Sequence, residues 1–319
     1  MSFGRYCVLF LVSLVLSATF CFFLIPLLKK VHAGQNILSY VKEHEKKSGT
    51  PTMGGIAFVL ASLLSLVFFV GKWSRTLIVT IVVGIAFMIV GLLDDLLKKK
   101  RKKNLGLTAW QKIVFQLLVA IVASFYAVRS GVTALSIPFL NQKMELGWWY
   151  FPLAVLVFLA TVNCVNLTDG LDGLASGVCV PFFLFFGILI GGMGDYGSSA
   201  LAISLSASLV GYLLFNVSPA SVFMGDTGSL ALGGFASCLG VFSGNLLYIA
   251  VVGFAFVLSG GSVILQVLYF KITGGKRIFK MTPIHHHFQQ LGYKESQISY
   301  AYFAVTLALA LVCLASIFG

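Results

Sequence analysis

The sequence has few charged residues. Only 10% of its 319 residues are Asp, Glu, Lys or Arg, against about 25% in soluble domains. Hydrophobic residues make up 59% of the chain, and the mean hydropathy is +0.98. Uninterrupted apolar runs of about 18 or more residues recur, each long enough to cross about 30 Å of hydrocarbon. The composition therefore excludes an ordinary soluble enzyme and places the chain in a lipid bilayer.

The sequence also lacks the alternation of apolar and polar residues that membrane barrels show. Only helices and closed barrels satisfy their backbone hydrogen bonds inside hydrocarbon. We therefore predict an all-α integral membrane protein, a bundle of about ten transmembrane helices that forms one polytopic domain over residues 1–319. The ten spans are expected to centre near Leu14, Leu63, Ala86, Val119, Leu156, Phe185, Leu209, Leu239, Val257 and Leu309.

No CxxC pair is present among the six cysteines, which lie in or beside apolar runs and are interpreted as small core residues. The first apolar segment, Phe3 to Leu27, is too long for a signal-peptide core and has no small-residue cleavage site before Lys29. We expect it to be a retained span. The six cysteines are Cys7, Cys21, Cys164, Cys179, Cys238 and Cys313.

Acidic residues are scarce, with 10 Asp and Glu against 22 Lys and Arg. Ten spans place both termini on one side, and 17 of the 22 cations then fall in loops on the other side. The positive-inside rule makes those loops cytoplasmic and both termini external. The net charge of +12 favours anionic membrane lipids as partners over nucleic acid, because no nucleic-acid-binding module is visible. The external cations are Arg5, Lys72, Arg75, Arg129 and Lys143.

Five of the six aspartates fall at cytoplasmic ends of spans. Carboxylates kept near a membrane usually face a wet cavity and serve a functional site. The first such segment is LLDDLLKKKRKK, residues 92–103, where Asp94 and Lys98 are one helical turn apart and Asp95 projects about 100° away. The basic run alone is typical of a stop-transfer signal. Adjacent acids before it are not required by topology and suit a magnesium phosphate centre.

The second segment is NCVNLTDGLDGLA, residues 163–175. Asn163, Asn166, Asp169 and Asp172 supply polar partners, and the glycines allow close backbone approach to a ligand. An Asx-rich turn between helices is the structural alternative. A calcium loop is disfavoured because the glutamate and the full acidic series are missing.

The third segment is FNVSPASVFMGDTGSLALG, residues 215–233. Asp226 lies between Gly225 and Gly228 where an apolar helix begins, so we expect it to act as an N-cap beside free amides. Such a position attracts cations and phosphates. A purely capping aspartate is the alternative.

The fourth segment is KRIFKMTPIHHHFQQLGY, residues 276–293, with His285, His286 and His287 in a basic loop. Neighbouring residues of a helix diverge by about 100°, so the three cannot share one zinc ion. Phosphate contact is the preferred role, with one histidine in proton transfer.

Hard oxygen donors dominate these four segments, so Mg²⁺ is the expected cofactor. Carboxylates, lysines and histidines around one metal suit phosphoryl transfer, which depends on positioning and charge neutralisation. A transporter or lipid carrier is the alternative of a different class. Transporters usually place ionisable groups near the midplane between internal repeats, and the sequence shows neither feature.

These segments resemble the polyprenyl-phosphate N-acetylhexosamine-1-phosphate transferase superfamily, and within it the branch that uses muramoyl-pentapeptide donors. The PIHHH block favours that branch over relatives that use N-acetylglucosamine donors, which remain the alternative. The matching pieces follow the family's order along nearly the whole chain: GTPTMGG at 49–55, LLDDLLK at 92–98, LTAWQK at 107–112, NLTDGLDGLA at 166–175, VFMGDTGSLALGG at 222–234, and SVILQVLYFK with RIFKMTPIHHHF within 262–288.

The resemblance implies Mg²⁺-dependent transfer of phospho-MurNAc-pentapeptide from UDP-MurNAc-pentapeptide to undecaprenyl phosphate, with release of UMP and formation of lipid I. It implies a homodimer in the bacterial inner membrane, acting in peptidoglycan synthesis. Direct attack by the lipid phosphate and a two-step path through an aspartyl-phosphate both stay open.

The resemblance also implies residue roles. Asp226 would bind Mg²⁺, Asp94 would deprotonate the lipid phosphate with Asp95 beside it, and Lys112 would steady phosphate charge. The three histidines, His285, His286 and His287, would close the site, with His285 counted as catalytic. The nucleotide pocket would be formed by Lys47, Asn166, Gly170, Leu171, Asp172, Phe223 and Gln266.

One departure from the family pattern precedes SVILQV. Family members usually carry an acid there, whereas this chain has Ser259, Gly260 and Gly261. The ninth span of the family is typically broken or bent, and the paired glycines could supply that bend. We expect the substitution to be tolerated.

Overall fold

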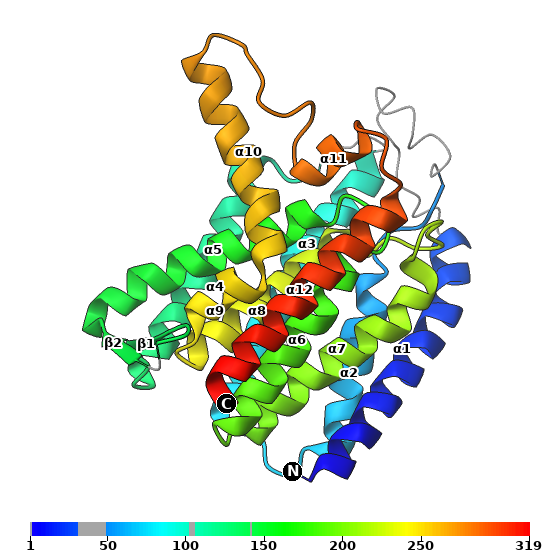
Figure 1. Ribbon diagram of the computed structural model, residues 1–319. Coiled ribbons are helices and arrows are strands. Elements are labelled where there is room, and N and C mark those ends of the chain that lie inside the picture. Colours follow the sequence, from blue (N-terminus) through cyan, green and yellow to red (C-terminus); the bar gives the residue numbers. More distant parts are fainter. Residues whose placement is uncertain (1, 31–48, 102–105, 141) are drawn as a thin grey trace.

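The computed structural model describes residues 2–30, 49–140 without 102–105, and 142–319. Both chain termini lie at the same end of the helical bundle (Figure 1). The helices are α1 (Phe3–Lys30), α2 (Gly55–Phe69), α3 (Arg75–Arg101), α4 (Ala109–Arg129), α5 (Tyr150–Thr168), α6 (Leu174–Gly192), α7 (Tyr196–Asn216), α8 (Gly225–Phe242), α9 (Leu246–Val252), α10 (Phe254–Ile272), α11 (Ile284–Gln289) and α12 (Glu295–Phe318). Strands β1 (Ala134–Ile137) and β2 (Gln142–Glu145) and the 3₁₀ helix η2 (Gly147–Trp149) complete the described elements.

Eight helices in the described part of the chain are long and apolar enough to cross a membrane: α1, α3, α4, α5 with η2, α6, α7, α10 and α12. The all-α membrane fold is therefore confirmed. Helix α2 is apolar but has only 15 residues, and α8 has 18. Each predicted span centre lies in a helix, although Leu239 falls in the last turn of α8. The total of ten spans stays a prediction.

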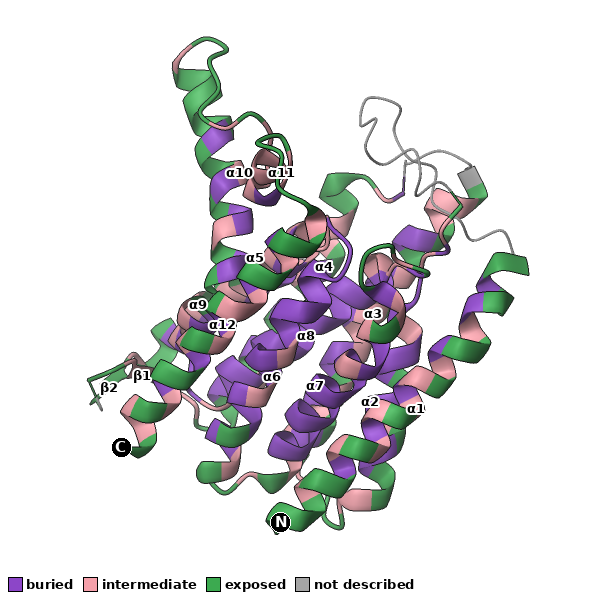
Figure 2. Ribbon diagram, turned by 45° about the vertical axis from the view of Figure 1, so that its right-hand side comes forward, coloured by how far each residue is buried: buried purple, intermediate pink, exposed green. Residues whose placement is uncertain are grey.

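Helix α8 occupies the centre of the bundle and is buried along most of its length (Figure 2). Glycines let its neighbours approach closely. A Cβ atom at Gly84 of α3 would collide with the Phe235 ring, and one at Gly233 of α8 would collide with Val162 of α5. Small residues stabilise helix pairs in lipid because close backbone contact replaces the hydrophobic effect that drives packing in water.

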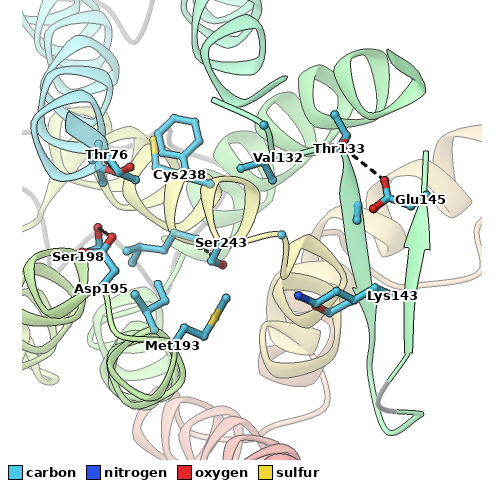
Figure 3. A pocket seen from close by; sticks show the side chains of 18 residues that line it. Thr76, Val132, Thr133, Lys143, Glu145, Met193, Asp195, Ser198, Cys238 and Ser243 are labelled. Atoms are coloured by element: carbon cyan, nitrogen blue, oxygen red, sulfur yellow. Dashed lines mark hydrogen bonds between the residues drawn. The ribbon is translucent and has the colours of Figure 1, made fainter. Parts of the chain in front are cut away.

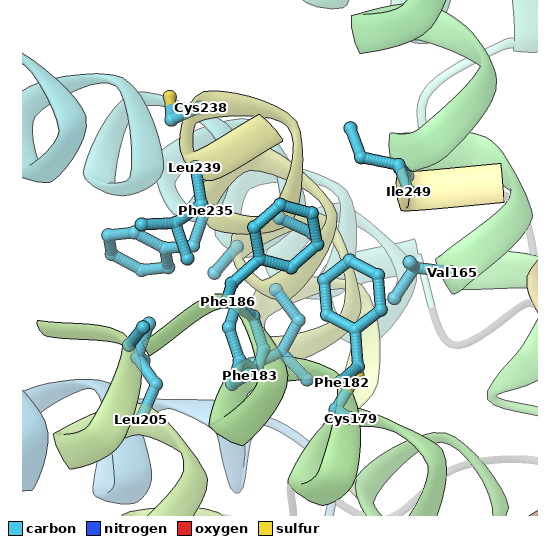
Figure 4. Packing of buried hydrophobic residues seen from close by; sticks show 14 of the residues in the cluster. Val165, Cys179, Phe182, Phe183, Phe186, Leu205, Phe235, Cys238, Leu239 and Ile249 are labelled. Atoms are coloured by element: carbon cyan, nitrogen blue, oxygen red, sulfur yellow. The ribbon is translucent and has the colours of Figure 1, made fainter. Parts of the chain in front are cut away.

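Aromatic side chains of α6, among them Phe182, Phe183 and Phe186, lie beside Phe235 of α8 in the buried core (Figure 4). The Phe182 ring lies 4.9 Å from the Phe186 ring and 5.5 Å from the Phe256 ring, and all three side chains are buried. These contacts join α6 to α10, so dispersion between the rings holds these two helices together. The polar loops are attached to the other ends of the two helices.

The segment between α4 and α5 contains a small hairpin. Strands β1 and β2 are antiparallel, with Ala134 opposite Glu145. The hairpin borders a cavity of about 410 Å³ (Figure 3). Thr76, in the first turn of α3, lines this cavity, whereas Asp94 lies eighteen residues later, about 27 Å along the helix. The hairpin and the Asp94 carboxylate therefore lie at opposite ends of the bundle.

The helix break in the ninth predicted span lies at Gly253, not at the paired glycines. Helix α9 ends at Val252, and α10 runs without interruption through Gly260 and Gly261. Gly260 instead provides space, because a Cβ atom there would collide with the Cys164 sulfur of α5.

Candidate active site

Three carboxylates meet where α3 ends and α8 begins. Asp94, Asp95 and Asp226 each have a carboxylate oxygen within 4.8 Å of the others. Asp94 and Asp95 are 2% and 3% exposed, so two acids sit almost entirely out of water. Such a cluster is stable only where cations or hydrogen-bond donors compensate its charge.

Asp95 uses its carboxylate to cap helix α8. Its Oδ1 accepts a hydrogen bond from the Asp226 N–H at 3.2 Å, and its Oδ2 accepts from the Thr227 N–H at 2.9 Å and the Thr227 hydroxyl at 2.7 Å. The expectation that Asp226 is the N-cap was wrong. Met224 holds that position without a side-chain bond. The free N–H groups of α8 are instead satisfied by an acid from α3, which leaves the Asp226 carboxylate for other partners.

Asp94 faces the segment that leads into α4. Its Oδ1 accepts a hydrogen bond from the Leu107 N–H at 2.7 Å, and its Oδ2 lies 2.6 Å from the Lys98 ammonium. The Lys98 contact confirms the expected one-turn spacing. A Cβ atom at Gly106 would collide with this carboxylate. Glycine is therefore required for the segment to pass so close to Asp94.

Two lysines converge on Asp226. The Lys98 Nζ lies 2.9 Å from Asp226 Oδ2, and the Lys112 Nζ lies 2.6 Å from the same oxygen. The predicted site included Lys112 but omitted Lys98. The signal that could have identified Lys98 was its position four residues after Asp94, on the same helical face.

Asn166 belongs to the carboxylate centre. Its Nδ2 donates to Asp226 Oδ1 and to Ser229 Oγ, both at 2.8 Å, and its Oδ1 lies 3.5 Å from the Lys112 Nζ. Asn163, one turn earlier, donates to Gln116 of α4 at 2.7 Å. The structure thus attaches Asn166 directly to the residue predicted to bind metal.

The loop after α5 is braced by Asp172. Its Oδ2 accepts from the Ala220 N–H at 3.0 Å, and its own N–H donates to Glu295 at 3.2 Å. Ser299 donates to its carbonyl at 2.9 Å. Asp169 caps the end of α5 and is outside the group of three carboxylates. Burial, followed by the charges of Asp226, Asp95 and Asp172, raises the pKa of Asp169 well above its usual value.

His285 is fully buried against the same loop. A Cβ atom at Gly170 would collide with its Nε2, and neither ring nitrogen has a hydrogen-bond partner among the described residues. Burial, with a smaller contribution from His286, lowers the pKa of His285 to about 3. The imidazole is therefore neutral near pH 7 and does not provide positive charge for a phosphate.

The other two histidines have different partners. The Lys280 N–H donates to His287 Nδ1 at 3.2 Å, and His286 Nδ1 lies 2.7 Å from Gln289 Oε1. His286 and His287 thus have different hydrogen-bond partners, although the His285 and His286 rings lie 4.4 Å apart.

The remaining predicted nucleotide residues lie around this end of the bundle. Gln266 Oε1 accepts from the Ile278 and Phe279 N–H groups at 3.1 and 3.0 Å, so it holds the basic loop. The Phe223 N–H donates to the Pro51 carbonyl at 2.8 Å. This bond joins the GTPTMGG segment, residues 49–55, to the VFMGDTGSLALGG segment, residues 222–234. Leu171 is buried, and Lys47 lies outside the described residues.

The donor set fits a hard divalent cation. The three clustered groups are carboxylates, and Mg²⁺ prefers carboxylate and phosphate oxygens. Asp226 already gathers positive charge from Lys98 and Lys112, so the same point also suits the oxygens of a pyrophosphate. The arrangement can bring two phosphates together and neutralise their charge.

Comparison with known proteins gives consistent matches. The model of glycosyl transferase family 4 matches residues 77–244, and signature 1 of phospho-N-acetylmuramoyl-pentapeptide-transferases matches residues 47–59. The carboxylate cluster lies inside the first match.

Full-length relatives share the same name, phospho-N-acetylmuramoyl-pentapeptide-transferase. The chain is 43% identical over 295 residues to the protein of Clostridium perfringens strain SM101, covering 92% of this chain and 91% of that protein. It is 43% identical over 304 residues to the protein of Clostridium botulinum strain Eklund 17B, and the match covers 95% of this chain and 92% of that protein. Identity to the protein of Caldanaerobacter subterraneus is 43% over 286 residues, and the match covers 89% of this chain and 90% of that protein.

Proposed function

Because this chain belongs to the phospho-N-acetylmuramoyl-pentapeptide-transferase family, we propose that it transfers phospho-MurNAc-pentapeptide from UDP-MurNAc-pentapeptide to undecaprenyl phosphate. The products are lipid I and UMP. The observation that carries the proposal is the meeting of Asp94, Asp95 and Asp226 with Lys98 and Lys112 at one end of a membrane bundle.

The chemistry suits this site. An oxygen of the lipid phosphate forms a bond to the sugar-bearing phosphorus, and the bond from that phosphorus to UMP breaks, so one pyrophosphate linkage replaces another. The exchange needs little net free energy. It requires that two anions are held together and that the negative charge developing on the leaving UMP is neutralised. Lys98 and Lys112 supply fixed positive charge for that purpose.

Each residue of the site has a separate role in the transfer. Asp94 accepts the proton of the lipid phosphate, and the Leu107 N–H and Lys98 hold its carboxylate in place. Asp95 fixes α8, which carries Asp226. Asp226, with Asp94 beside it, would hold Mg²⁺, which when bound supplies further charge neutralisation at the pyrophosphate. Asn166 keeps the Asp226 carboxylate oriented.

We further propose that the protein lies in the bacterial inner membrane with both termini outside and the site at the cytoplasmic surface. Lys29, Lys30, Lys98 and Lys112 lie toward the ends of α1, α3 and α4 nearest the carboxylates, whereas Arg5, Arg75 and Arg129 lie at the opposite ends of these three helices. Labelling of a cysteine placed at Ser2 by a membrane-impermeant maleimide in intact spheroplasts tests the orientation, and absence of labelling would reverse it. A homodimer is expected by family resemblance, and native mass spectrometry of the purified protein tests it.

The test of the reaction is UMP release by purified protein with Mg²⁺, undecaprenyl phosphate and UDP-MurNAc-pentapeptide. We expect release with this donor, none with UDP-GlcNAc, and none after chelation. Asp226→Asn should abolish release, and the matched variant Asp195→Asn, at the opposite end of the bundle, should retain it. Release only with UDP-GlcNAc would reassign the donor. Substrate flux into proteoliposomes without turnover would instead indicate a carrier.

A further inference from the structure

The hairpin formed by β1 and β2 is attached to the ends of two membrane-spanning helices by short connections. Residues 130–133 separate the end of α4 from β1, and Leu146 alone separates β2 from η2, where the α5 span begins. The Ser136 N–H donates to the Gly244 carbonyl at 2.8 Å, which fastens β1 to the turn after α8. The hairpin is therefore held against the bundle, and it projects to one side at the end that holds both termini (Figure 1).

The two faces of the hairpin differ in polarity. Side chains alternate between the faces of a strand, so Lys143 and Glu145 of β2 share one face and Met144 points to the other. Lys143 and Glu145 line the cavity of about 410 Å³, and Glu145 accepts a hydrogen bond from the Thr133 hydroxyl at 3.3 Å (Figure 3). The polar face is thus turned toward the bundle, and Met144 is turned away from it.

Large apolar side chains are exposed in the hairpin and directly after it. Phe139 and Leu140 in the turn are 53% and 59% exposed, and Trp148 and Trp149 of η2 are 65% and 77% exposed. Exposed apolar surface of this kind marks an interaction site, because its contact with water is unfavourable. Together with the exposed Met144, five side chains form this apolar surface: Phe139, Leu140, Met144, Trp148 and Trp149.

The apolar surface is continuous with the lipid-facing side of α5, which identifies lipid as its partner. Tryptophan is enriched where spans meet the membrane–water interface. Cations at the same end, Arg129 of α4 and Lys143 of β2, suit the phosphates of lipid head groups. An exposed stripe with helical spacing runs from the tryptophans along one face of the α5 span: Trp149, Pro152, Leu156 and Ala160.

We propose that the hairpin is an interfacial membrane anchor, whose five apolar side chains lie among the lipid head groups and the first acyl carbons. The anchor lies at the membrane surface opposite the carboxylate cluster. Its polar face separates the cavity from the lipid, and its attachment to η2 fixes the depth at which α5 enters the bilayer. This inference does not depend on the reaction that the protein catalyses.

Tryptophan quenching by brominated lipids tests the anchor, because bromine quenches only on contact. The chain has four tryptophans, and a background with phenylalanine at all four positions keeps the apolar surface. Met144→Trp and Lys143→Trp then place a single tryptophan at neighbouring positions on opposite faces of β2. In phosphatidylcholine vesicles with lipid brominated near the head group, we expect quenching at least about twofold stronger for Met144→Trp than for Lys143→Trp. Adding Leu140→Asp should weaken the quenching of Met144→Trp, and the matched Leu140→Phe should not.

The two tryptophans of η2 give a second readout that introduces no new aromatic residue. With Trp73→Phe and Trp110→Phe, emission comes from Trp148 and Trp149 alone, and bromine near the head group should quench it more strongly than bromine near the acyl end. Equal quenching of Met144→Trp and Lys143→Trp, or acrylamide quenching of Met144→Trp as strong as that of free tryptophan amide, would overturn the proposal. Protection of Met144→Trp from both lipid and water would also overturn it, because a second copy of the chain would then cover the hairpin.

Discussion

Asp95 accepts hydrogen bonds on one carboxylate oxygen from both the backbone N–H and the hydroxyl of Thr227, at 2.9 and 2.7 Å. The last part of α3 is thereby fastened to the first turn of α8. A carboxylate at this point also interacts favourably with the positive end of the α8 dipole. Asp94, its neighbour in sequence, instead contacts Leu107 and Lys98. Adjacent acids thus serve different purposes.

Replacing the two aspartates should separate these purposes. Asp95→Asn opposes an NH₂ group to the donors of α8, so we expect it to lower the thermal midpoint by several degrees, since a buried donor left unsatisfied costs about 1–3 kcal/mol. Asp94→Asn should keep the midpoint within about 2 °C, a change equivalent to less than about 1 kcal/mol. It should nevertheless lower kcat at least about 100-fold. Differential scanning fluorimetry and UMP release measure the two effects. Thr227→Val, which removes only the hydroxyl bond, should fall between the unmodified protein and Asp95→Asn in stability; equal stability of all the variants would contradict the capping role.

Removal of a lysine should change metal affinity in a defined direction. Lys98→Met takes one positive charge away from Asp94 and Asp226, so the remaining site is more negative and should bind Mn²⁺ more tightly. Asp226→Asn should bind it more weakly. Electron paramagnetic resonance titration of free Mn²⁺ measures this without turnover. Weaker Mn²⁺ binding in Lys98→Met would mean that the lysine does not oppose the metal.

Replacing each of the paired glycines of α10 by alanine should affect the thermal midpoint differently. Gly260→Ala places a Cβ atom against the Cys164 sulfur, whereas Gly261→Ala meets nothing within 4 Å. We expect the first to lower the thermal midpoint and the second to leave it unchanged or raise it. Adding Cys164→Ala should restore the midpoint of Gly260→Ala. A double-mutant cycle in detergent measures the coupling, and strictly additive effects would show that the two residues do not touch.

An acid at position 259 should not improve the protein. Ser259 is completely buried, and its hydroxyl donates to the Ala255 carbonyl. A buried carboxylate without a partner is strongly unfavourable. We therefore expect Ser259→Glu to lower the thermal midpoint without raising kcat. Activity gained in Ser259→Glu would show that the departure from the family pattern impairs this chain.

His285 should make stability depend on pH. Its pKa falls from 6.5 in the unfolded chain to about 3 in the folded protein, so between these values only the unfolded chain binds the proton. The contribution is absent above pH 6.5 and destabilises the fold as pH decreases, by about 1.4 kcal/mol per pH unit. Midpoints from pH 7.5 to 5 should therefore fall less steeply in His285→Asn. His287→Asn is the control, and equal slopes for His285→Asn and the unmodified protein would contradict a neutral buried ring.

Sequence alone determined that the chain lies in a membrane and which segments carry the chemistry. Hydrophobic length and the unfavourable insertion of charge are local properties, so runs of apolar residues and the retained acids are visible without a structure. The pairing of Asp94 with Lys98 was also predictable, because helical geometry fixes contacts four residues apart.

Only the tertiary structure decided how the acids divide their roles. Asp95 and Thr227 are 132 positions apart, and no local spacing encodes that contact. For the same reason the sequence assigned the cap of α8 to Asp226 and missed both the second contact of Lys98 and the space that Gly106 leaves for Asp94. Which carboxylate faces a cation and which holds a helix depends on how α3, α4, α5 and α8 pack, since hydrogen bonds across helices form only where packing brings donor and acceptor together.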